Sequence, residues 1–513
     1  MSLPAHGVCH HELVLRRRAR LWIVATLSAW LLVTAASQGA TTAEADQPDV
    51  YAAVASTPVG QTMAPGFVGL SLEYKAIHAY TGRNPDAVNP VLVRLLAQLA
   101  PGQAPGLRIG GDSTDATRWP VPGVIPPGGN SYSLTPGWMR TTRALANALG
   151  ARLIMGINLA SGRPALAAAE GRAFVRGIGR SHIAAFEIGN EPDLYSAFPS
   201  YRDRTNAVSF TRPRNYTQSR LTRDFSRWRA VLPSIPIAGP ALAELPWLNS
   251  LPQFLSAQRG LALLTIHRYP LRACTTNPSD PSYPTIASVL ADQSSSGLAQ
   301  AVAPYVAIAH ARGAQFRIDE LNSAACSGRP GVSDTFASAL WMLDTLFNLA
   351  SVGVDGVNVH TLPGSAYEPF SFSQTGPSWH AFVRPEYYGM LMFAQAFPPG
   401  AQLLPASASS GSVKIWATRA TDGTLRIVLI NKDTTAGHTV QLQAPGIGRQ
   451  STLEWLRAPS VSATSGVTFG GRTFGLDTSS GQLKGPLALN QTFSLLNSNT
   501  VDLPPASAVL FTQ

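Results

Sequence analysis

The stretch "AAFEIGNEPDLY", residues 184–195, runs from an apolar segment directly into Asn190-Glu191-Pro192. An ionised carboxylate next to a buried strand costs free energy unless a neighbouring group compensates it. In parallel α/β folds, polar side chains that act on ligands gather at the C-terminal ends of apolar strands. Glu191 is therefore a solvated loop charge, a structural partner of another side chain, or one half of a catalytic pair.

Seven further short apolar runs lie between residues 66 and 361, separated by amphipathic stretches such as "NPVLVRLLAQLA" at 89–100. Apolar runs that alternate with helical patterns indicate parallel strands joined by helical crossovers, and eight such units predict a TIM barrel. A doubly wound open sheet is the rival fold, but the run at 106–115 has no G-x-G-x-x-G spacing. The runs are 66–74, 106–115, 151–160, 183–193, 235–242, 261–270, 315–322 and 355–361.

The character of the chain changes near residue 400. Short β-prone runs such as "SVKIWATRA" at 412–420 and "TLRIVLINKD" at 424–433 are separated by turn signals, among them Asp422-Gly423. We expect an α/β protein with a (β/α)8 barrel over 66–398 and a C-terminal all-β sandwich over 399–513. Residues 41–65 are expected to be a linker, from which the run at 50–56 can contribute a strand to the sandwich.

The first forty residues have the pattern of a signal peptide. Arg16, Arg17, Arg18 and Arg20 precede the apolar stretch at 21–36, and small residues follow at 37–40. The apolar stretch is shorter than the roughly 20 residues that a membrane span needs. We expect residues 1–40 to be removed and the protein to be secreted, periplasmic or extracellular. The alternative is an uncleaved leader that anchors the protein in a membrane.

Composition and cysteine content restrict the partners and the redox setting. The formal net charge is +10, which favours acidic partners or reflects general surface charge. Outside the leader there is no dense Lys/Arg run and no nucleic-acid motif, so no nucleic acid and no stable membrane partner are expected. Cys274 and Cys326 remain after the leader. They form a disulfide or stay as two free buried thiols.

Polar residues stand at the C-terminal ends of the predicted strands. Because these ends form the active-site face of a TIM barrel, the pattern predicts an enzyme. The residues are Glu73, Asp112, Asn158, Asn190, Glu191, His267, Tyr269, Glu320, Asn322 and His360.

Two of these residues match the requirement of glycoside hydrolysis for two opposed carboxyl groups. Glu191 ends the fourth run and Glu320 ends the seventh, so both face the barrel mouth. In the retaining reaction the two groups lie about 5–5.5 Å apart, one as nucleophile and one as acid/base. Asn190 is placed to bind the sugar 2-hydroxyl. Tyr269 is placed to donate a hydrogen bond that keeps Glu320 ionised while Glu191 stays protonated.

Other polar residues have structural interpretations. Glu187 is expected to be a hydrogen-bonded residue of the barrel interior. Asp319 should point away from Glu320 because side chains alternate along a strand, and Asp193 should cap a helix. His267 and His360 are potential metal ligands, but no carboxylate or Cys stands at ligand spacing. Substrate contact or an interior hydrogen bond is expected instead, with no metal.

Several motifs carry a family resemblance that covers residues 50–513. "FEIGNEPD" and "RIDELNS" resemble the acid/base and nucleophile strands of clan A retaining glycoside hydrolases. "FVGLSLEY", "LRIGGDSTD", "IHRYPLRAC" and "VRPEYYGMLMF" narrow the resemblance to glycoside hydrolase family 79, which contains β-glucuronidases and heparanases. The tail is similar to the C-terminal β-domain of that family.

The resemblance implies a role for each matching residue. Glu191 would be the acid/base and Glu320 the nucleophile, with Tyr269 orienting it. The substrate hydroxyls would be bound by other residues of the barrel mouth, and the resemblance also implies that no metal or organic cofactor is needed. The substrate-binding residues would be Glu73, Asp112, Asn190 and His267.

The resemblance also implies a site for the carboxylate of a uronic acid. A Tyr near the top of the eighth strand, helped by a Gly backbone N–H, binds this group in family 79. Tyr367 and Gly364 in "HTLPGSAYEPF" match these residues, although the Gly of the family lies closer to its Tyr. Donors built for an anion reject a neutral sugar because they are left unpaired.

The expected function is therefore an exported, retaining, exo-acting β-glucuronidase that acts on glycans or glycoconjugates. One alternative is a retaining glycosidase that acts on a neutral sugar. Another is a non-catalytic carbohydrate-binding protein of the cell surface. The stretch at 196–215 carries four Arg and either shapes the cleft or is a solvated loop.

Overall fold

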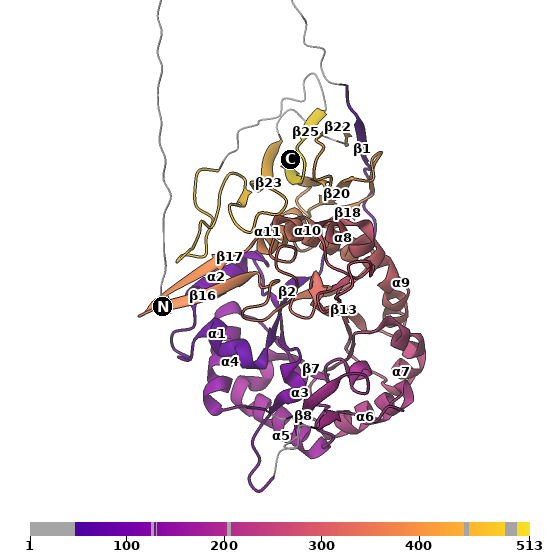
Figure 1. Cartoon of the computed structure of the whole chain (residues 1–513), viewed down its shortest axis with the longest axis vertical. Helices are drawn as coiled ribbons and strands as arrows, with labels where there is room; N and C mark the ends of the chain where they lie inside the picture. The colour runs from indigo at the N-terminus through magenta and orange to yellow at the C-terminus, as the bar shows by residue number, and fades with distance from the viewer. Residues whose placement is uncertain (1–46, 125–127, 130, 203–206, 446–450, 488–499) are drawn as a thin grey trace, which may run out of the picture. The chain divides into compact units, whose positions relative to one another are not determined.

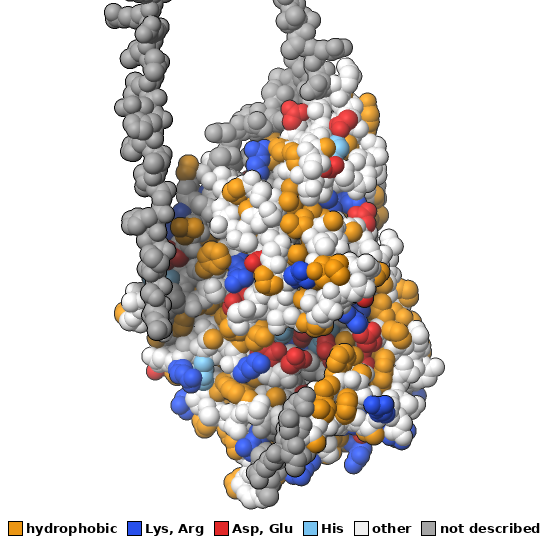
Figure 2. Space-filling model, in the orientation of Figure 1, with side chains coloured by type: hydrophobic (Ala, Val, Ile, Leu, Met, Phe, Trp, Pro, Cys, Tyr) orange, Lys and Arg blue, Asp and Glu red, His pale blue; other side chains and the backbone are white. Residues whose placement is uncertain are grey.

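The computed structural model describes residues 47–513 except 125–127, 130, 203–206, 446–450 and 488–499. Residues Gln47–Gln513 form one compact unit (Figure 1). The predicted signal peptide lies outside the described residues. Of the helices within the described ranges, none has the length and apolar character to cross a membrane. On the face shown in Figure 2, basic side chains are scattered rather than gathered in one block.

Eight parallel strands close into the predicted barrel. The order around the barrel is β10-β11-β13-β15-β2-β3-β6-β7, so consecutive strands in the chain are neighbours. Their interior positions are almost entirely buried, which explains why the runs read as continuously apolar. The strands are β2 (Val68–Glu73), β3 (Gly106–Gly110), β6 (Leu153–Ile157), β7 (Ile183–Ile188), β10 (Ile237–Leu242), β11 (Leu263–Arg268), β13 (Gln315–Leu321) and β15 (Gly356–Thr361).

Helices surround the barrel, and local sequence signals explain where some of them begin. The Asn89 side chain accepts hydrogen bonds from the N–H groups of Val91 and Leu92, with Pro90 at the first helical position. The helices are α1 (Ile77–Thr81), α2 (Pro90–Gln98), α3 (Ser113–Ala116), α4 (Pro136–Leu149), α5 (Pro164–Phe174), α6 (Gln218–Val231), α7 (Leu251–Ala257), α8 (Ile286–Leu290), α9 (Ser296–His310), α10 (Phe336–Ser351) and α11 (Pro385–Ala396).

The C-terminal part is all-β, as predicted. One sheet has the order β18-β20-β21-β26-β23-β24 and the other β19-β1-β22-β25, with apolar side chains of both in a shared core. Residues of the predicted 50–56 run form β1. The strands are β1 (Val50–Val54), β18 (Gln402–Leu404), β19 (Ala406–Ala408), β20 (Val413–Arg419), β21 (Leu425–Asn431), β22 (His438–Gln443), β23 (Thr452–Arg457), β24 (Thr468–Phe469), β25 (Thr500–Leu503) and β26 (Ser507–Thr512).

Four small two-stranded sheets complete the described structure. All four lie in segments that follow barrel strands, and the last of them also precedes α11. They are β4 (Thr117–Arg118) with β5 (Tyr132–Ser133), β8 (Pro199–Arg202) with β9 (Val208–Phe210), β12 (Leu271–Arg272) with β14 (Ala324–Ala325), and β16 (Phe370–Thr375) with β17 (Ser378–Val383).

A buried polar contact joins the barrel to the β-sheets. Asp344 of α10 lies 2.5 Å from Nζ of Lys432 and accepts a hydrogen bond of 3.0 Å from the indole N–H of Trp416. The Trp416 ring stacks on Phe347 at 5.3 Å between centroids. Asp344 is 1% exposed, so this ion pair is shielded from solvent.

Candidate active site

Glu191 leaves the end of β7 in an uncommon backbone conformation. Its φ of 47° and ψ of 51° are left-handed, which costs free energy for a residue other than glycine. Its N–H donates to the carbonyl oxygen of Ala241 at 2.9 Å, which fixes the turn against the end of β10. The side chain remains 21% exposed, so Glu191 is accessible in the barrel mouth.

His267 lies between the two predicted catalytic glutamates. Its Nδ1 is 3.0 Å from Oε1 of Glu191 and 3.7 Å from Oε2 of Glu320. One oxygen of each carboxylate and a ring nitrogen of His267 all lie within 4.8 Å of one another. This separation fits the retaining arrangement, at about 5–5.5 Å, and is too short for the inverting one, at about 6.5–9.5 Å.

Glu320 is held by a neutral donor and a cationic donor. The Tyr269 hydroxyl donates to Oε1 at 2.6 Å, and Nη1 of Arg108 donates to Oε2 at 2.7 Å. Burial by itself would raise the pKa of Glu320. The positive charges of His267 and Arg108, with the Tyr269 hydrogen bond, outweigh burial and lower that pKa. Glu320 is therefore an oriented, ionised carboxylate.

Arg108 is the central residue that the sequence reasoning missed. It is 0% exposed and extends from β3 through the barrel interior. Nη2 donates to Oδ1 of Asn190 at 3.0 Å, and Nε pairs with Glu187 at 2.6 Å. The available signal was an arginine inside the otherwise apolar run "GLRIGG", since an interior arginine needs carboxylate partners.

Of the two interior carboxylates, Glu187 was predicted correctly and Asp319 was not. Glu187 is fully buried against Arg108, as predicted. Asp319 does not point away from Glu320, because Oδ2 of Asp319 lies 3.1 Å from Nε of Arg108. The pairing register of β13 with β15 shifts between Ile318 and Leu321. This irregularity breaks the alternation, so both consecutive acids face the interior.

The protonation of His267 follows from the carboxylates around it. Burial lowers its pKa, but the charge of Glu320 and the hydrogen bond to Glu191 raise it to about 10. Nη2 of Arg108 lies 3.1 Å from Nε2, a contact that favours a neutral ring. The opposing carboxylates prevail, because they act on both ring nitrogens at short range. His267 therefore carries a proton on Nδ1 that it donates to Glu191.

Glu73 holds a turn. Its carboxylate accepts the N–H groups of Asp112 at 3.0 Å and Ser113 at 2.8 Å, and also the Ser113 hydroxyl. Gly111 has φ +75°, and a Cβ there would lie 2.4 Å from Oε1 of Glu73, so only glycine fits. Sugar binding by Glu73 stays a prediction, whereas its use in shaping this turn was not foreseen.

Asp112, presented by that turn, is exposed to the barrel mouth. Its Oδ1 accepts from Nδ2 of Asn190 at 3.3 Å. The surrounding protein atoms, and then the charges of Glu191, Glu73 and Glu320, raise the pKa of Asp112 to about 8, although water still reaches its surface. A protonated carboxyl there can donate to a ligand as well as accept.

Tyr367 and Gly364 have different outcomes. The Tyr367 ring lies 6.3 Å from the Tyr269 ring and 6.0 Å from the His360 ring, centroid to centroid. It is therefore beside the carboxylate pair. The N–H of Gly364 donates to Oε2 of Glu368 at 3.0 Å. Binding of a sugar carboxylate by this N–H stays a prediction, and it would require the N–H to leave Glu368.

The two cysteines form the predicted disulfide. Cys274 and Cys326 are bonded with a Cα–Cα distance of 5.7 Å. They follow the paired strands β12 and β14, which themselves follow Tyr269 and Glu320 in the chain. The bond therefore covalently links the two loops beside the nucleophile and its hydrogen-bond donor.

In the segment after β7, the structure corrects the predicted role of Asp193 and refines the interpretation of the Arg-containing stretch at 196–215. Asp193 does not cap a helix. Its carboxylate accepts the N–H groups of Ala243 and Glu244, which fixes the loop after β10. Arg212 packs 5.5 Å from the ring centroids of both Tyr195 and Tyr216, so it anchors the hairpin rather than facing a ligand.

The donor atoms of Glu191, His267 and Glu320 are close enough to surround a cation. We assign no ion to them, because the guanidinium of Arg108 already lies against Glu320.

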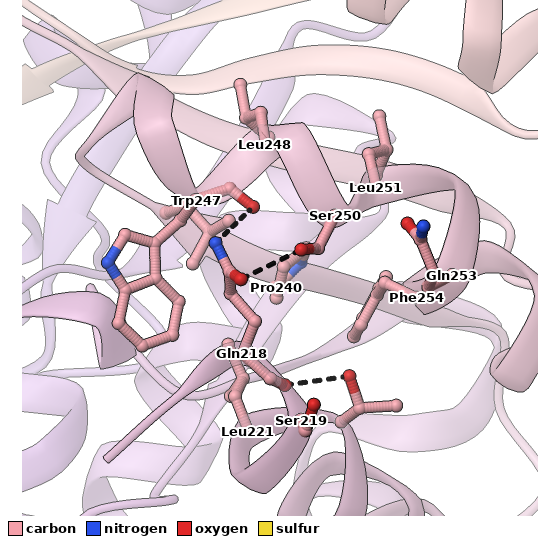
Figure 3. Close-up of a pocket in the computed structure, with 12 residues that line it drawn as sticks. Gln218, Ser219, Leu221, Pro240, Trp247, Leu248, Ser250, Leu251, Gln253 and Phe254 are labelled. Atoms are coloured by element: carbon pink, nitrogen blue, oxygen red, sulfur yellow. Dashed lines mark hydrogen bonds between the residues drawn. The ribbon is translucent and has the colours of Figure 1, made fainter. Parts of the chain in front are cut away.

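A separate cavity of about 180 Å³ opens between α6 and α7 (Figure 3). Pro240 and Trp247 line it, and Gln218 accepts a hydrogen bond from Ser250 there. It contains neither catalytic glutamate.

Comparison with known proteins shows that the chain is a glycoside hydrolase. Residues 415–510 match the glycosyl hydrolase family 79 C-terminal beta domain. A β-glucuronidase of Neurospora crassa is 25% identical over 398 residues, which are 71% of this chain and 69% of the relative. A β-glucuronidase of Aspergillus niger is 26% identical over 48% of this chain and about half of its own length, 47%. These matches support the resemblance to glycoside hydrolase family 79.

Solved structures of glycosidases share the fold of this chain. A 4-O-α-L-rhamnosyl-β-D-glucuronidase of Fusarium oxysporum superposes with a TM-score of 0.67 at 19% identity, over 90% of this chain and 100% of that one. A family 51 arabinofuranosidase of Xanthomonas axonopodis has a TM-score of 0.63 at 16% identity, over 91% and 100%. At these identities the likeness establishes the architecture alone, and the substrate has to be argued from the site.

Proposed function

We propose that this glycoside hydrolase is a retaining, exo-acting β-glucuronidase. The observation that carries the proposal is the Glu191–Glu320 pair, whose oxygens lie within 4.8 Å across the barrel mouth with an ionised Glu320. The two relatives named as β-glucuronidases support the choice of sugar. The substrate is accordingly a glycan or glycoconjugate that carries a β-linked glucuronic acid.

In the first step, an oxygen of Glu320 attacks the anomeric carbon while the bond to the leaving oxygen breaks. Glu191 gives its proton to that oxygen, so the aglycone leaves as an alcohol. Tyr269 and Arg108 orient the nucleophile before the attack. Asn190 is held by Arg108 and Asp112 beside Glu191, in position for a contact with the 2-hydroxyl.

In the second step, Glu191 removes a proton from a water molecule, whose oxygen then attacks the anomeric carbon. The ester bond to Glu320 breaks, and glucuronic acid leaves with its original β-configuration. His267 donates to Glu191 at 3.0 Å. It therefore keeps the Glu191 side chain in place between the two steps.

The substrate carboxylate is proposed to bind the Tyr367 hydroxyl. Tyr367 is 5% exposed and packs beside Tyr269 and His360, so its hydroxyl is held in one place by the rings around it. A hydroxyl fixed in this way makes its strongest hydrogen bond when the acceptor is an anion. The Gly364 N–H takes no part, because Glu368 accepts it.

The test is hydrolysis of p-nitrophenyl β-D-glucuronide compared with p-nitrophenyl β-D-glucoside, with Glu320→Gln as the inactive control. We expect a strong preference for the glucuronide and first formation of the β-anomer in an NMR time course. Tyr367→Phe should reduce kcat/KM for the glucuronide about 10-fold or more, since a hydrogen bond to a charged group is worth about 1.5–3 kcal/mol, and should leave the glucoside rate less affected.

A neutral β-glycoside is the second candidate substrate, favoured by the engaged N–H of Gly364. Preference for the glucoside, with no effect of Tyr367→Phe on the ratio of the two rates, would select it.

We also infer export of the protein, on the basis of the leader pattern at 1–40. Amino-terminal sequencing of the protein secreted by its host would test this. A mature chain that begins near residue 41 supports cleavage, and an intact leader in the membrane fraction supports the anchored alternative.

A further inference from the structure

Two buried carboxyl groups converge on one nitrogen of Arg108. Oε2 of Glu187 lies 2.6 Å and Oδ2 of Asp319 lies 3.1 Å from Nε. Both acids are 0% exposed. They come from different strands, β7 and β13, and meet beneath the carboxylate pair. An Nε–H is a single donor, so it cannot satisfy two full negative charges at once.

The remaining oxygens of the two acids lack well-placed donors. Oε1 of Glu187 and both oxygens of Asp319 are buried without a hydrogen bond of good geometry among the described residues when each carboxyl is counted only as an acceptor. Oδ2 of Asp319 has only the shared Nε of Arg108 at 3.1 Å, and the Thr265 hydroxyl is a further donor beside Glu187 that helps to lower its pKa. A buried acceptor left in this state is costly. The cost disappears if one carboxyl carries a proton and donates it to the other. The two groups are within side-chain hydrogen-bonding reach of each other.

We propose that Glu187 and Asp319 share one proton and act together as a single negative charge on the Nε side of Arg108. The guanidinium then keeps its Nη1 side for Glu320, at 2.7 Å. If both acids were ionised, Arg108 would lie against two negative charges on its Nε side, and its attraction for Glu320 would weaken. Asp319 is thus a positioning residue that acts through Arg108, and its effect on the nucleophile depends on the proposed function.

The surrounding charges agree with this distribution. Arg108 lowers the pKa of Glu187 against the effect of its burial. Burial, followed by the charge of Glu187, raises the pKa of Asp319 well above its ordinary range. His267 approaches Asp319 at 3.7 Å, too far to replace the missing donor. The charged or titratable side chains that act on the pair are Arg108, His267, Arg317, Glu320 and Tyr74.

The experiment is infrared difference spectroscopy of the full-length protein at neutral pH, comparing wild type with Asp319→Asn and with Glu187→Gln. We expect each single variant to lose the signal of one protonated carboxyl group, because the acid that remains becomes the ionised partner of Arg108. Glu170→Gln, which removes a different buried acid, shows that the method resolves one group.

Loss of the signal in Asp319→Asn alone would mean that the proton resides on Asp319 without sharing, and loss in neither variant would mean that both acids are ionised. Either result overturns the proposal. If a variant does not fold, an atomic-resolution crystal structure of the wild type decides the matter. Unequal C–O bonds in one of the two carboxyls, with the longer bond ending on an oxygen that contacts the other acid, support the shared proton. Equal bonds in both, or a longer bond that points away from the other acid, overturn it. These measurements do not use turnover, so they remain informative if the glucuronide is not the substrate.

Discussion

Nη1 of Arg108 lies 2.7 Å from Oε2 of Glu320, and both groups are buried. The guanidinium also reaches Asn190 and His267, so one side chain of β3 connects residues at the C-terminal ends of β7, β11 and β13. The geometry of the nucleophile therefore depends on an arginine that need not contact the sugar. Because several buried charges depend on it, Arg108 has consequences for both stability and activity.

Replacement of Arg108 by Met should strongly reduce both the stability and the activity of the protein. It removes the positive charge from three buried carboxyls, and loss of one partner of a buried ion pair costs about 3–5 kcal/mol. We expect the denaturation midpoint in urea to fall strongly and activity to be lost even in the folded fraction, because Glu320 loses its cationic donor. Arg227→Met, at an exposed position of α6, is the control. A stable and active Arg108→Met variant would contradict this account of the site.

Tyr269→Phe should separate orientation of the nucleophile from substrate binding. The lost hydrogen bond is 2.6 Å long and ends on an ionised oxygen, and such bonds are worth about 1.5–3 kcal/mol. We expect kcat to fall about 10- to 100-fold with a smaller change in KM. The acidic limb of the pH profile should move to higher pH, because the hydrogen bond helps to lower the pKa of Glu320. Tyr51→Phe, at an exposed residue of β1, should have no effect; an unchanged kcat in Tyr269→Phe would refute the role.

Glu191→Ala should be rescued by a small external nucleophile. Without the acid/base, an activated substrate such as p-nitrophenyl glucuronide can still form the ester on Glu320, because its leaving group needs no proton. Azide should then accelerate turnover and yield a glycosyl azide with retained configuration, identified by NMR. Glu320→Ala should give either no rescue or a product of inverted configuration. Rescue with inversion in Glu191→Ala would show that the two roles are exchanged.

Much of this architecture could be predicted from residue patterns. Strands such as β7 and β13 are buried on both faces and read as apolar runs, and a carboxylate at the end of such a run is conspicuous. Glu191, Glu320 and Tyr269 were recognisable because each stands at a strand end. The disulfide was foreseeable because only two cysteines remain outside the leader.

The features that the sequence did not predict depend on the register of strand pairing and on partner residues far apart in the chain. Arg108 lies inside a strand, where an arginine signals buried carboxylate partners but the run does not show which carboxylates they are. Asp319 was misplaced because a register shift in β13 breaks the two-residue alternation. Gly364 was assigned by resemblance to family 79, in which the Gly lies closer to the Tyr, but the N–H of Gly364 donates to Glu368, a partner that no spacing reveals.

The contact between the barrel and the β-sheets should contribute measurably to stability. Lys432→Met leaves the buried carboxylate of Asp344 without its cation at 2.5 Å, and we expect a loss of about 3–5 kcal/mol in the free energy of unfolding. Lys484→Met, at an exposed lysine, is the matched control. Since Asp344 lies on α10, away from the carboxylate pair, the folded variant should keep the wild-type kcat/KM. A loss of activity without a loss of stability would contradict this assignment.

Glu170 should make stability fall as pH rises. It is 2% exposed, and burial, with the nearby charge of Asp115, raises its pKa to about 8 against the hydrogen bond from the Asn158 N–H. The folded protein therefore keeps a proton that the unfolded chain releases above its ordinary pKa. The stabilising contribution is complete below about pH 4.5 and is lost as the pH rises toward 8.

Glu170→Gln removes this proton linkage, because Gln is neutral at every pH. Urea denaturation between pH 5 and 8 should show a slope of unfolding free energy against pH that is shallower in the variant by up to about 1.4 kcal/mol per pH unit. The variant should be less stable than wild type, or equal to it, at pH 5 and should gain relative to it at pH 8. Asp86→Asn, which changes an exposed carboxylate, should leave the slope unchanged. Parallel curves for Glu170→Gln and wild type would mean that Glu170 is ionised in the folded protein.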